Sequence, residues 1–273
     1  MGTYLPLVKR LLPPALWRPA SQFRYALLRA VQLPSATFHP WRRHSIRLLG
    51  DYYKRHEGER CFILGNGPSL KRTDLSKLKN EITFGMNRIY LAFDEMGYQP
   101  TYYVSINDLV IEQCLQDILN LPMPKFLSWR SHRFFIHPPD DRTIFLHTTY
   151  TGPKFATDVR GRLWEGATVT YVALQLAFFM GFQQVILVGV DHSFSTQGRP
   201  NTTVVSQGDD RDHFHSNYFG KGFRWQLPDL ETSERAYRMA KEAFEKAGRV
   251  VLDATIEGKL EVFPKVDYDH LFG

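Results

Sequence analysis

The chain has 273 residues and a mass of 31.7 kDa, enough for one large α/β domain or two small ones. Hydrophobic residues make up 43%, charged residues 23% and aromatic residues 14%, so a disordered, collagen-like or coiled-coil chain is excluded. No apolar run reaches the roughly 18–20 residues that cross a bilayer, and Cys61 and Cys114 are too few for a disulfide framework, so we expect a cytoplasmic protein.

The net charge of +6 lies mainly at the N-terminus. Residues 1–60 carry a net +8, which leaves −2 for the rest of the chain. We predict a basic helical extension at 1–57, followed by one domain at 58–273. Prolines are expected to cut the extension into short pieces, and they are Pro13, Pro14, Pro19, Pro34 and Pro40.

Basic residues interleaved with Leu, Trp and Phe suit an anionic membrane surface or a protein partner. The extension would then hold the protein at the inner face of the membrane. The alternative is a helical collar that packs on the main domain. No nucleic-acid partner is expected, because the basic stretch matches no standard nucleic-acid-binding module.

Strands and helices alternate along the remaining chain. Apolar runs predict strands at 60–64, 82–86, 102–106, 125–129, 143–147, 184–190 and 250–252. Helical periodicity predicts helices at 108–121, 171–180 and 231–247, with a short helix starting at Pro68. All-apolar strands are typical of a sheet covered on both faces. The fold class is therefore α/β, with a Rossmann-like, mostly parallel open sheet and helices on both faces.

Ligands of open parallel sheets bind at the carboxyl ends of the strands. The sharpest signal there is Gly65-Asn66-Gly67-Pro68-Ser69, which follows the first strand. Its glycines allow a close backbone approach, and its free amides can hold a phosphate. It is neither a Walker A motif nor the dinucleotide fingerprint. The alternative is a tight turn in which Ser69 caps the next helix.

Other strand ends and a helix start carry polar residues. Asn87 and Asn107 suit the reading of a ribose or base edge, although asparagine also ends strands as a turn former. Gly166 and Thr168 open the most apolar helix and offer a second phosphate contact, or plain capping. Asp191 ends the strand that follows.

A long loop at about 191–230 concentrates acids and histidines. His213 and His215 are candidate general bases, with Asp209, Asp210 or Asp212 to orient them or hold a cation. Lys221, Arg224 and Trp225 could clamp a sugar or anionic substrate. A solvated loop explains the same residues, but long loops in compact domains are often binding loops.

These motifs carry a resemblance to known enzymes. The run Gly65-Asn-Gly-Pro-Ser-Leu70, the later Asn87 and Asn107, and the strand Val185–Asp191 resemble bacterial sialyltransferases that use CMP-sugars. They are also similar to the wider group of the archaeal 6-hydroxymethylpterin pyrophosphokinase (domain of unknown function 115), which includes the motility accessory factors. The similarity spans about residues 58–263.

The resemblance implies a role for most of the candidates. Asn66, Gly67 and Ser69 would meet the phosphate and ribose, and Asn87 and Asn107 the cytidine. The full nucleotide-binding set is Gly65, Asn66, Gly67, Pro68, Ser69, Asn87, Asn107, Asp108, Gly166, Thr168 and Asp191, and the substrate set is His192, Lys221, Arg224 and Trp225. Where that family has a tyrosine after the strand, this chain has His192-Ser-Phe194.

We therefore expect a glycosyltransferase that moves a sugar from a CMP-sugar to a glycan or small-molecule acceptor in surface glycan biosynthesis, with no metal or other cofactor required. The alternative is an ATP-dependent pyrophosphokinase, with Mg²⁺ held by Asp108 or Asp191 and a pterin slot built from Tyr102, Phe194 or Trp225. A third reading is a non-catalytic nucleotide-binding scaffold. The sequence is compatible with an oligomer.

Overall fold

The structure is a computed structural model that describes residues 14–196 and 198–273, with side chains from residue 23 onward. Residues 1–13 of the predicted extension, including Pro13, lie outside the described residues. The helices are α2 (Pro14–Phe38), α3 (Pro40–Gly50), α4 (Phe93–Met96), α5 (Asp108–Gln113), α6 (Leu115–Asn120), α7 (Val169–Met180) and α8 (Leu230–Lys246). The strands are β1 (Arg60–Leu64), β2 (Thr83–Met86), β3 (Tyr102–Ser105), β4 (Lys125–Ser128), β5 (Thr143–Thr149), β6 (Arg162–Trp164), β7 (Gln184–Val188), β8 (Thr203–Val205), β9 (Arg224–Gln226) and β10 (Val250–Asp253). Short 3₁₀ helices cover Pro68–Arg72, Leu75–Leu78, Ile89–Ala92, Trp129–Phe134 and Asp269–Phe272.

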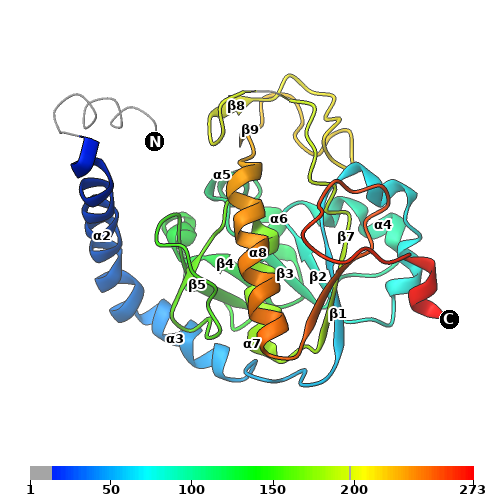
Figure 1. The fold of residues 1–273 in the computed structure, drawn as a ribbon, viewed down its shortest axis with the longest axis horizontal. Helices are drawn as coiled ribbons and strands as arrows, with labels where there is room; N and C mark the ends of the chain where they lie inside the picture. Colours follow the sequence, from blue (N-terminus) through cyan, green and yellow to red (C-terminus); the bar gives the residue numbers. More distant parts are fainter. Residues whose placement is uncertain (1–13, 197) are drawn as a thin grey trace.

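Eight strands form one parallel sheet in the order β10-β7-β1-β2-β3-β4-β5-β6. From β1 the chain builds outward strand by strand to β6, and then returns to place β7 on the other side of β1 (Figure 1). The direction of strand order therefore reverses between β1 and β7. This is the switch point at which open α/β sheets bind ligands.

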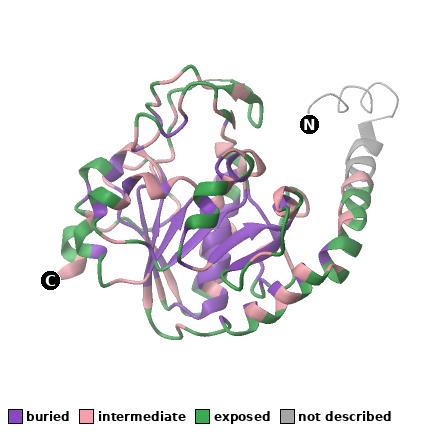
Figure 2. Ribbon diagram, turned by 180° about the vertical axis from the view of Figure 1, so that it is seen from behind, coloured by how far each residue is buried: buried purple, intermediate pink, exposed green. Residues whose placement is uncertain are grey.

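Alternate residues of the strands pack into two cores, one on each face of the sheet. Cys61 and Ile63 of β1 face a core that includes α7, α8 and Leu49 of α3. Phe62 and Leu64 face the second core, which includes α5 and α6. Figure 2 shows the strands as the buried centre of the molecule. The predicted fold class is confirmed: helices cover both faces of a parallel sheet.

The N-terminal prolines do not cut the extension into short pieces. A single helix, α2, runs through Pro19 and Pro34, because an internal proline removes one hydrogen bond and bends a helix without having to end it. The break comes at His39, which is extended (φ −62°, ψ 133°) as a residue before proline prefers to be.

The two helices of the extension differ in how they meet the body. Helix α3 packs against β5: Leu49 is fully buried and Ser45 Oγ accepts a hydrogen bond from the Phe145 amide at 2.9 Å. Helix α2 stands at the rim of the molecule (Figures 1 and 2). Among the described residues, no helix combines the length and apolarity needed to cross a bilayer.

Candidate functional site

The turn after β1 crosses the turn after β7 at very short range. The Gly65 amide donates to Val188 O at 2.7 Å, and the Gly67 amide donates to Gly189 O at 3.0 Å. A Cβ on Gly65 would stand 2.1 Å from the Gly189 carbonyl oxygen. The approach of a neighbouring backbone is therefore enough to require glycine at position 65.

The amides expected to hold a phosphate are partly occupied by a side chain of the protein. The Asp191 carboxylate accepts hydrogen bonds from the Ser69 amide (3.1 Å) and from Ser69 Oγ (2.6 Å). Ser69 is 1% exposed, and Gly67, not Ser69, is the N-cap of the short helix. Burial raises the pKa of Asp191, while the hydrogen bonds from Ser69 oppose that rise. Ser69 thus anchors Asp191.

A cavity of about 1000 Å³ opens beside this turn, at the carboxyl ends of the strands. Figure 1 shows the segment between β7 and α8, which carries β8 and β9, rising above that end of the sheet. Of the predicted site residues, Gly65, Asn66, Gly67, Asn87, Asn107, Thr168, Asp191, His192, His213 and Trp225 line the cavity. Pro68, Ser69, Asp108, Gly166, His215, Lys221 and Arg224 are not among its lining residues.

Three asparagines line the cavity from neighbouring strand ends. The side-chain oxygen of Asn66 is buried and has no hydrogen-bond partner. Asn87, at φ +48°, accepts a hydrogen bond from Ser105 Oγ at 3.0 Å, and Asn107 accepts one from the Leu109 amide at 2.9 Å. Asn87 and Asn107 can therefore offer their amide nitrogens to a ligand, whereas Asn66 offers an acceptor. A buried unpaired acceptor costs about 1–3 kcal/mol, so a ligand donor at Asn66 would be stabilising.

The N-terminus of α7 forms another wall. Thr168 is its N-cap and accepts a hydrogen bond from the Thr170 amide at 3.3 Å. The preceding Ala167 has φ +59°, a conformation that non-glycine residues rarely adopt. Gly166 lies behind this wall, where a Cβ would meet Ala236 at 2.5 Å. A helix N-terminus directed at a cavity favours an anionic group there.

The loop histidines differ in position. His213 lines the cavity, and its Nδ1 lies 2.8 and 2.9 Å from the two carboxylate oxygens of Asp210. Its ring stacks on Tyr218, with ring centroids 4.1 Å apart. The amide of Phe214, the residue after His213, donates to Asn66 O at 2.9 Å, and this bond holds the loop against the end of β1. His215 instead accepts a hydrogen bond from the Asn217 amide at 3.1 Å.

Asp210 gives His213 the arrangement of a general base. Because Nδ1–H donates to the carboxylate, the neutral imidazole carries its lone pair on Nε2. Stacking on Tyr218 limits rotation of the ring.

His192 also lines the cavity, at φ +55°. Burial lowers the pKa of His192, against the opposing effect of Glu234.

The predicted substrate clamp is only partly assembled. Trp225 lines the cavity, but Arg224 forms an ion pair with Glu112 at 2.9 Å.

Asp108, from the predicted nucleotide-binding set, accepts hydrogen bonds from Ser131 Oγ (2.8 Å) and Arg133 (3.0 Å). These contacts hold Asp108 within an ion-pair cluster beside the cavity.

Several lining residues were not predicted, namely Tyr25, Tyr150, Trp164 and Arg199. Tyr150 follows β5, which ends two residues later than expected, so the strand-end rule would have found it with the correct boundary. Trp164 ends β6, a strand that the sequence did not reveal. Tyr25 comes from α2, far away in sequence, and carries no local signal.

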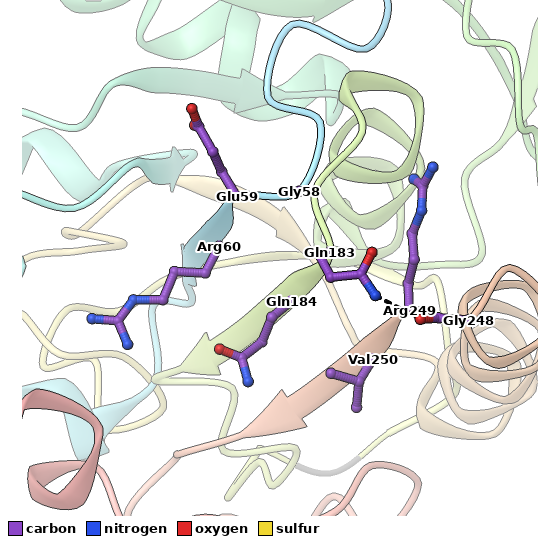
Figure 3. A pocket seen from close by; sticks show the side chains of 8 residues that line it. All are labelled: Gly58, Glu59, Arg60, Gln183, Gln184, Gly248, Arg249 and Val250. Atoms are coloured by element: carbon purple, nitrogen blue, oxygen red, sulfur yellow. Dashed lines mark hydrogen bonds between the residues drawn. The ribbon is translucent and has the colours of Figure 1, made fainter.

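A second depression lies at the opposite end of β1, β7 and β10 (Figure 3). Gln183 donates there to Gly248 O at 2.6 Å. Each charged side chain of its lining has a neighbour: Glu59 pairs with His56, Arg60 with Glu81, and Arg249 donates to Phe178 O. We therefore place the functional site in the cavity at the carboxyl ends.

Comparisons with known proteins bear on the family. A search of the curated proteins found no match. Among solved structures, the MAf glycosyltransferase from Magnetospirillum magneticum AMB-1 aligns with 94% of this chain at 15% identity and a TM-score of 0.45. This chain spans 42% of that protein's length.

A family model described as 6-hydroxymethylpterin diphosphokinase MptE-like matches residues 37–197, more than half of the sequence. The matched segment runs from the end of α2 through β7 and so includes both turns of the switch point. The chain therefore belongs to the MptE-like family.

Proposed function

We propose that this protein is a transferase that moves a sugar from a CMP-sugar donor to a hydroxyl group of a glycan or small-molecule acceptor. The observation that carries the proposal is His213, which is held by Asp210 and lines the same cavity as Asn66 and the N-terminus of α7. The side-chain oxygen of Asn66 is buried beside this cavity without a hydrogen-bond partner. One cavity then contains a general base, a hydrogen-bond acceptor for an N–H or O–H group of the nucleotide, and a wall that favours an anion.

Each part has a defined role in the reaction. Nε2 of His213 accepts the proton of the acceptor hydroxyl as its oxygen bonds to the anomeric carbon. The bond between that carbon and the phosphate oxygen breaks, and cytidine monophosphate leaves with the bonding pair. Asp210 stabilises the imidazolium that forms, and the α7 N-terminus favours the phosphate charge. The chemistry calls for no metal, because a single phosphate is the leaving group.

Nucleotide binding is tested by calorimetry with CMP, CDP and Mg-ATP. CMP is expected to bind, and Asn66→Ala to weaken it by about three- to tenfold, the value of one hydrogen bond. Asn120→Ala is the matched control, because Asn120 is exposed at the end of α6 and is not among the lining residues. Tight binding of Mg-ATP without binding of CMP would refute the donor class.

Catalysis is tested by the release of CMP from CMP-N-acetylneuraminate in the presence of a mixed glycan acceptor. His213→Ala should lower the rate about 10²- to 10⁴-fold while CMP binding persists. His215→Ala is the control in the same loop and should leave the rate unchanged. Equal loss of rate in both variants would contradict the assignment of His213 as the base.

The family description favours a second candidate, an ATP-dependent diphosphokinase acting on a pterin. Phe194 and Trp225 line the cavity and could stack on a pterin ring, whereas Tyr102 is buried elsewhere with its hydroxyl 2.7 Å from His56. Of the two carboxylates predicted to hold Mg²⁺, Asp108 and Asp191, Asp191 lines the cavity. Mg-dependent release of AMP from ATP with 6-hydroxymethyl-dihydropterin distinguishes this candidate from sugar transfer.

A further inference from the structure

The exposed side of α2 carries a continuous stripe of apolar residues. Phe23, Leu27, Val31 and Phe38, here called the apolar stripe, are 68%, 51%, 79% and 73% exposed. Steps of four and seven residues place all four on one face of a helix. Exposed apolar residues gathered in this way mark an interaction surface.

The opposite face of α2 is the one that meets the body. Arg29 donates to Thr151 Oγ1 at 3.1 Å and Ala36 is buried. Ser35 is exposed at the border of the apolar stripe, and its Oγ accepts from Trp129 Nε1 at 2.9 Å. Helix α2 stands at the rim of the molecule in both ribbon views (Figures 1 and 2). The apolar stripe is therefore turned away from the body, and folding does not explain it.

The charge around the apolar stripe selects its partner. Pro14–Phe38 contains no aspartate or glutamate, and the following α3 exposes Arg43 and Arg47. An apolar helix face with cationic surroundings is typical of helices that lie in the headgroup region of a bilayer. A second copy of the chain would bring the same positive charge and no acid on α2 to pair with it.

We propose that α2 docks on an anionic lipid bilayer, with the apolar stripe inserted at the boundary between headgroups and acyl chains. The helix lies on the membrane and does not cross it. Apolar insertion and attraction to anionic lipids contribute together, so binding depends on lipid charge and on salt. This surface function is independent of the reaction proposed for the cavity.

The test is co-sedimentation of the full chain with vesicles, either of phosphatidylcholine alone or of equal parts phosphatidylcholine and phosphatidylglycerol. We expect retention by the anionic vesicles and release in about 1 M salt, where the Debye length is about 3 Å. The double variant Phe23→Ser/Val31→Ser should bind at least about tenfold more weakly, since each side chain loses its transfer into the apolar layer. Substitution is preferred to deletion of the extension, because α3 contributes Leu49 to the core.

Ile136→Ser is the matched control, because Ile136 is an aliphatic residue that is 89% exposed on the body. It should bind vesicles like the wild-type chain. Circular dichroism and urea unfolding of each variant verify that the fold is intact. Equal retention by neutral and anionic vesicles, or full retention of the double variant, would overturn the proposal. A lipid-free dimer that the double variant dissociates would assign the stripe to a second copy instead.

Discussion

Replacing Asp191 with alanine should destabilise the protein, whereas replacing it with asparagine should not. The carboxylate is held by the amide and hydroxyl of Ser69, a residue that is 1% exposed. Alanine leaves both groups buried without a partner, at about 1–3 kcal/mol for a stranded donor. We expect Asp191→Ala to lower the free energy of unfolding by about 2–4 kcal/mol.

Asparagine keeps one acceptor oxygen for the Ser69 amide, and its NH₂ group can donate to the hydroxyl once that hydroxyl turns. It also removes a charge whose burial is unfavourable, as the raised pKa of Asp191 indicates. The free energy of unfolding of Asp191→Asn at neutral pH should therefore equal or exceed that of the wild type, by up to about 1 kcal/mol.

The same reasoning fixes the sign of the pH dependence. A carboxyl whose pKa is raised in the folded state keeps its proton where the unfolded chain has lost it. Its favourable contribution is therefore present below the ordinary pKa of 3.8 and is lost as pH rises through the folded pKa. Urea unfolding of both variants and the wild type across this range measures the effect. Equal destabilisation by asparagine and alanine would show that the charge is stabilising, contrary to this account.

Three further predictions concern stability and can be measured by urea unfolding. Gly65→Ala should destabilise by several kcal/mol, because its Cβ would stand 2.1 Å from a backbone oxygen. Gly67→Ala would instead displace the Asp191 side chain from Ser69 and should cost no more than the value of about 2–4 kcal/mol expected for Asp191→Ala; a larger loss in Gly67→Ala than in Gly65→Ala would contradict the crossing of the two turns. Burial lowers the pKa of His147 to about 4, so the wild type should lose up to about 3 kcal/mol as pH falls from 6.5 to about 4; an unchanged pH profile in His147→Leu would count against this. Arg130→Met leaves the buried Glu165 carboxylate unpaired and should cost about 3–5 kcal/mol, whereas the half-exposed Arg133→Met should cost less than about 1 kcal/mol; similar losses in the two variants would show that Arg130 does not stabilise Glu165.

Local pattern was sufficient to predict most of the sheet, because buried parallel strands are apolar on both faces. The predicted strand at 60–64 coincides with β1, and the helix at 231–247 differs from α8 by one residue at each end. The helix at 108–121 was wrong in one respect: Cys114 (φ −118°, ψ 20°) divides it into α5 and α6. Nothing in the residues around Cys114 indicates that break.

The site was harder to predict, because its decisive contacts are long-range. Ser69 and Asp191 are 122 residues apart in sequence, so no local pattern shows that the Asp191 carboxylate accepts hydrogen bonds from the amide and hydroxyl of Ser69. His213 and His215 lie in the same run of polar residues. Only their contacts in the folded protein distinguish them. His213 contacts Asp210 and Tyr218, whereas His215 contacts the local backbone.

The pairing of β1 with β7 also has a consequence for synthesis of the protein. Phe62 aligns with Ile186, so this edge of β1 has no partner until the ribosome has released the chain beyond residue 188. Closing so long a loop is entropically slow compared with the neighbouring pairing of β1 with β2. A nascent chain that contains residues 60–86 has both strands of the β1–β2 pair. The cavity can form only during or after synthesis of the last third of the chain, because β7 lies there.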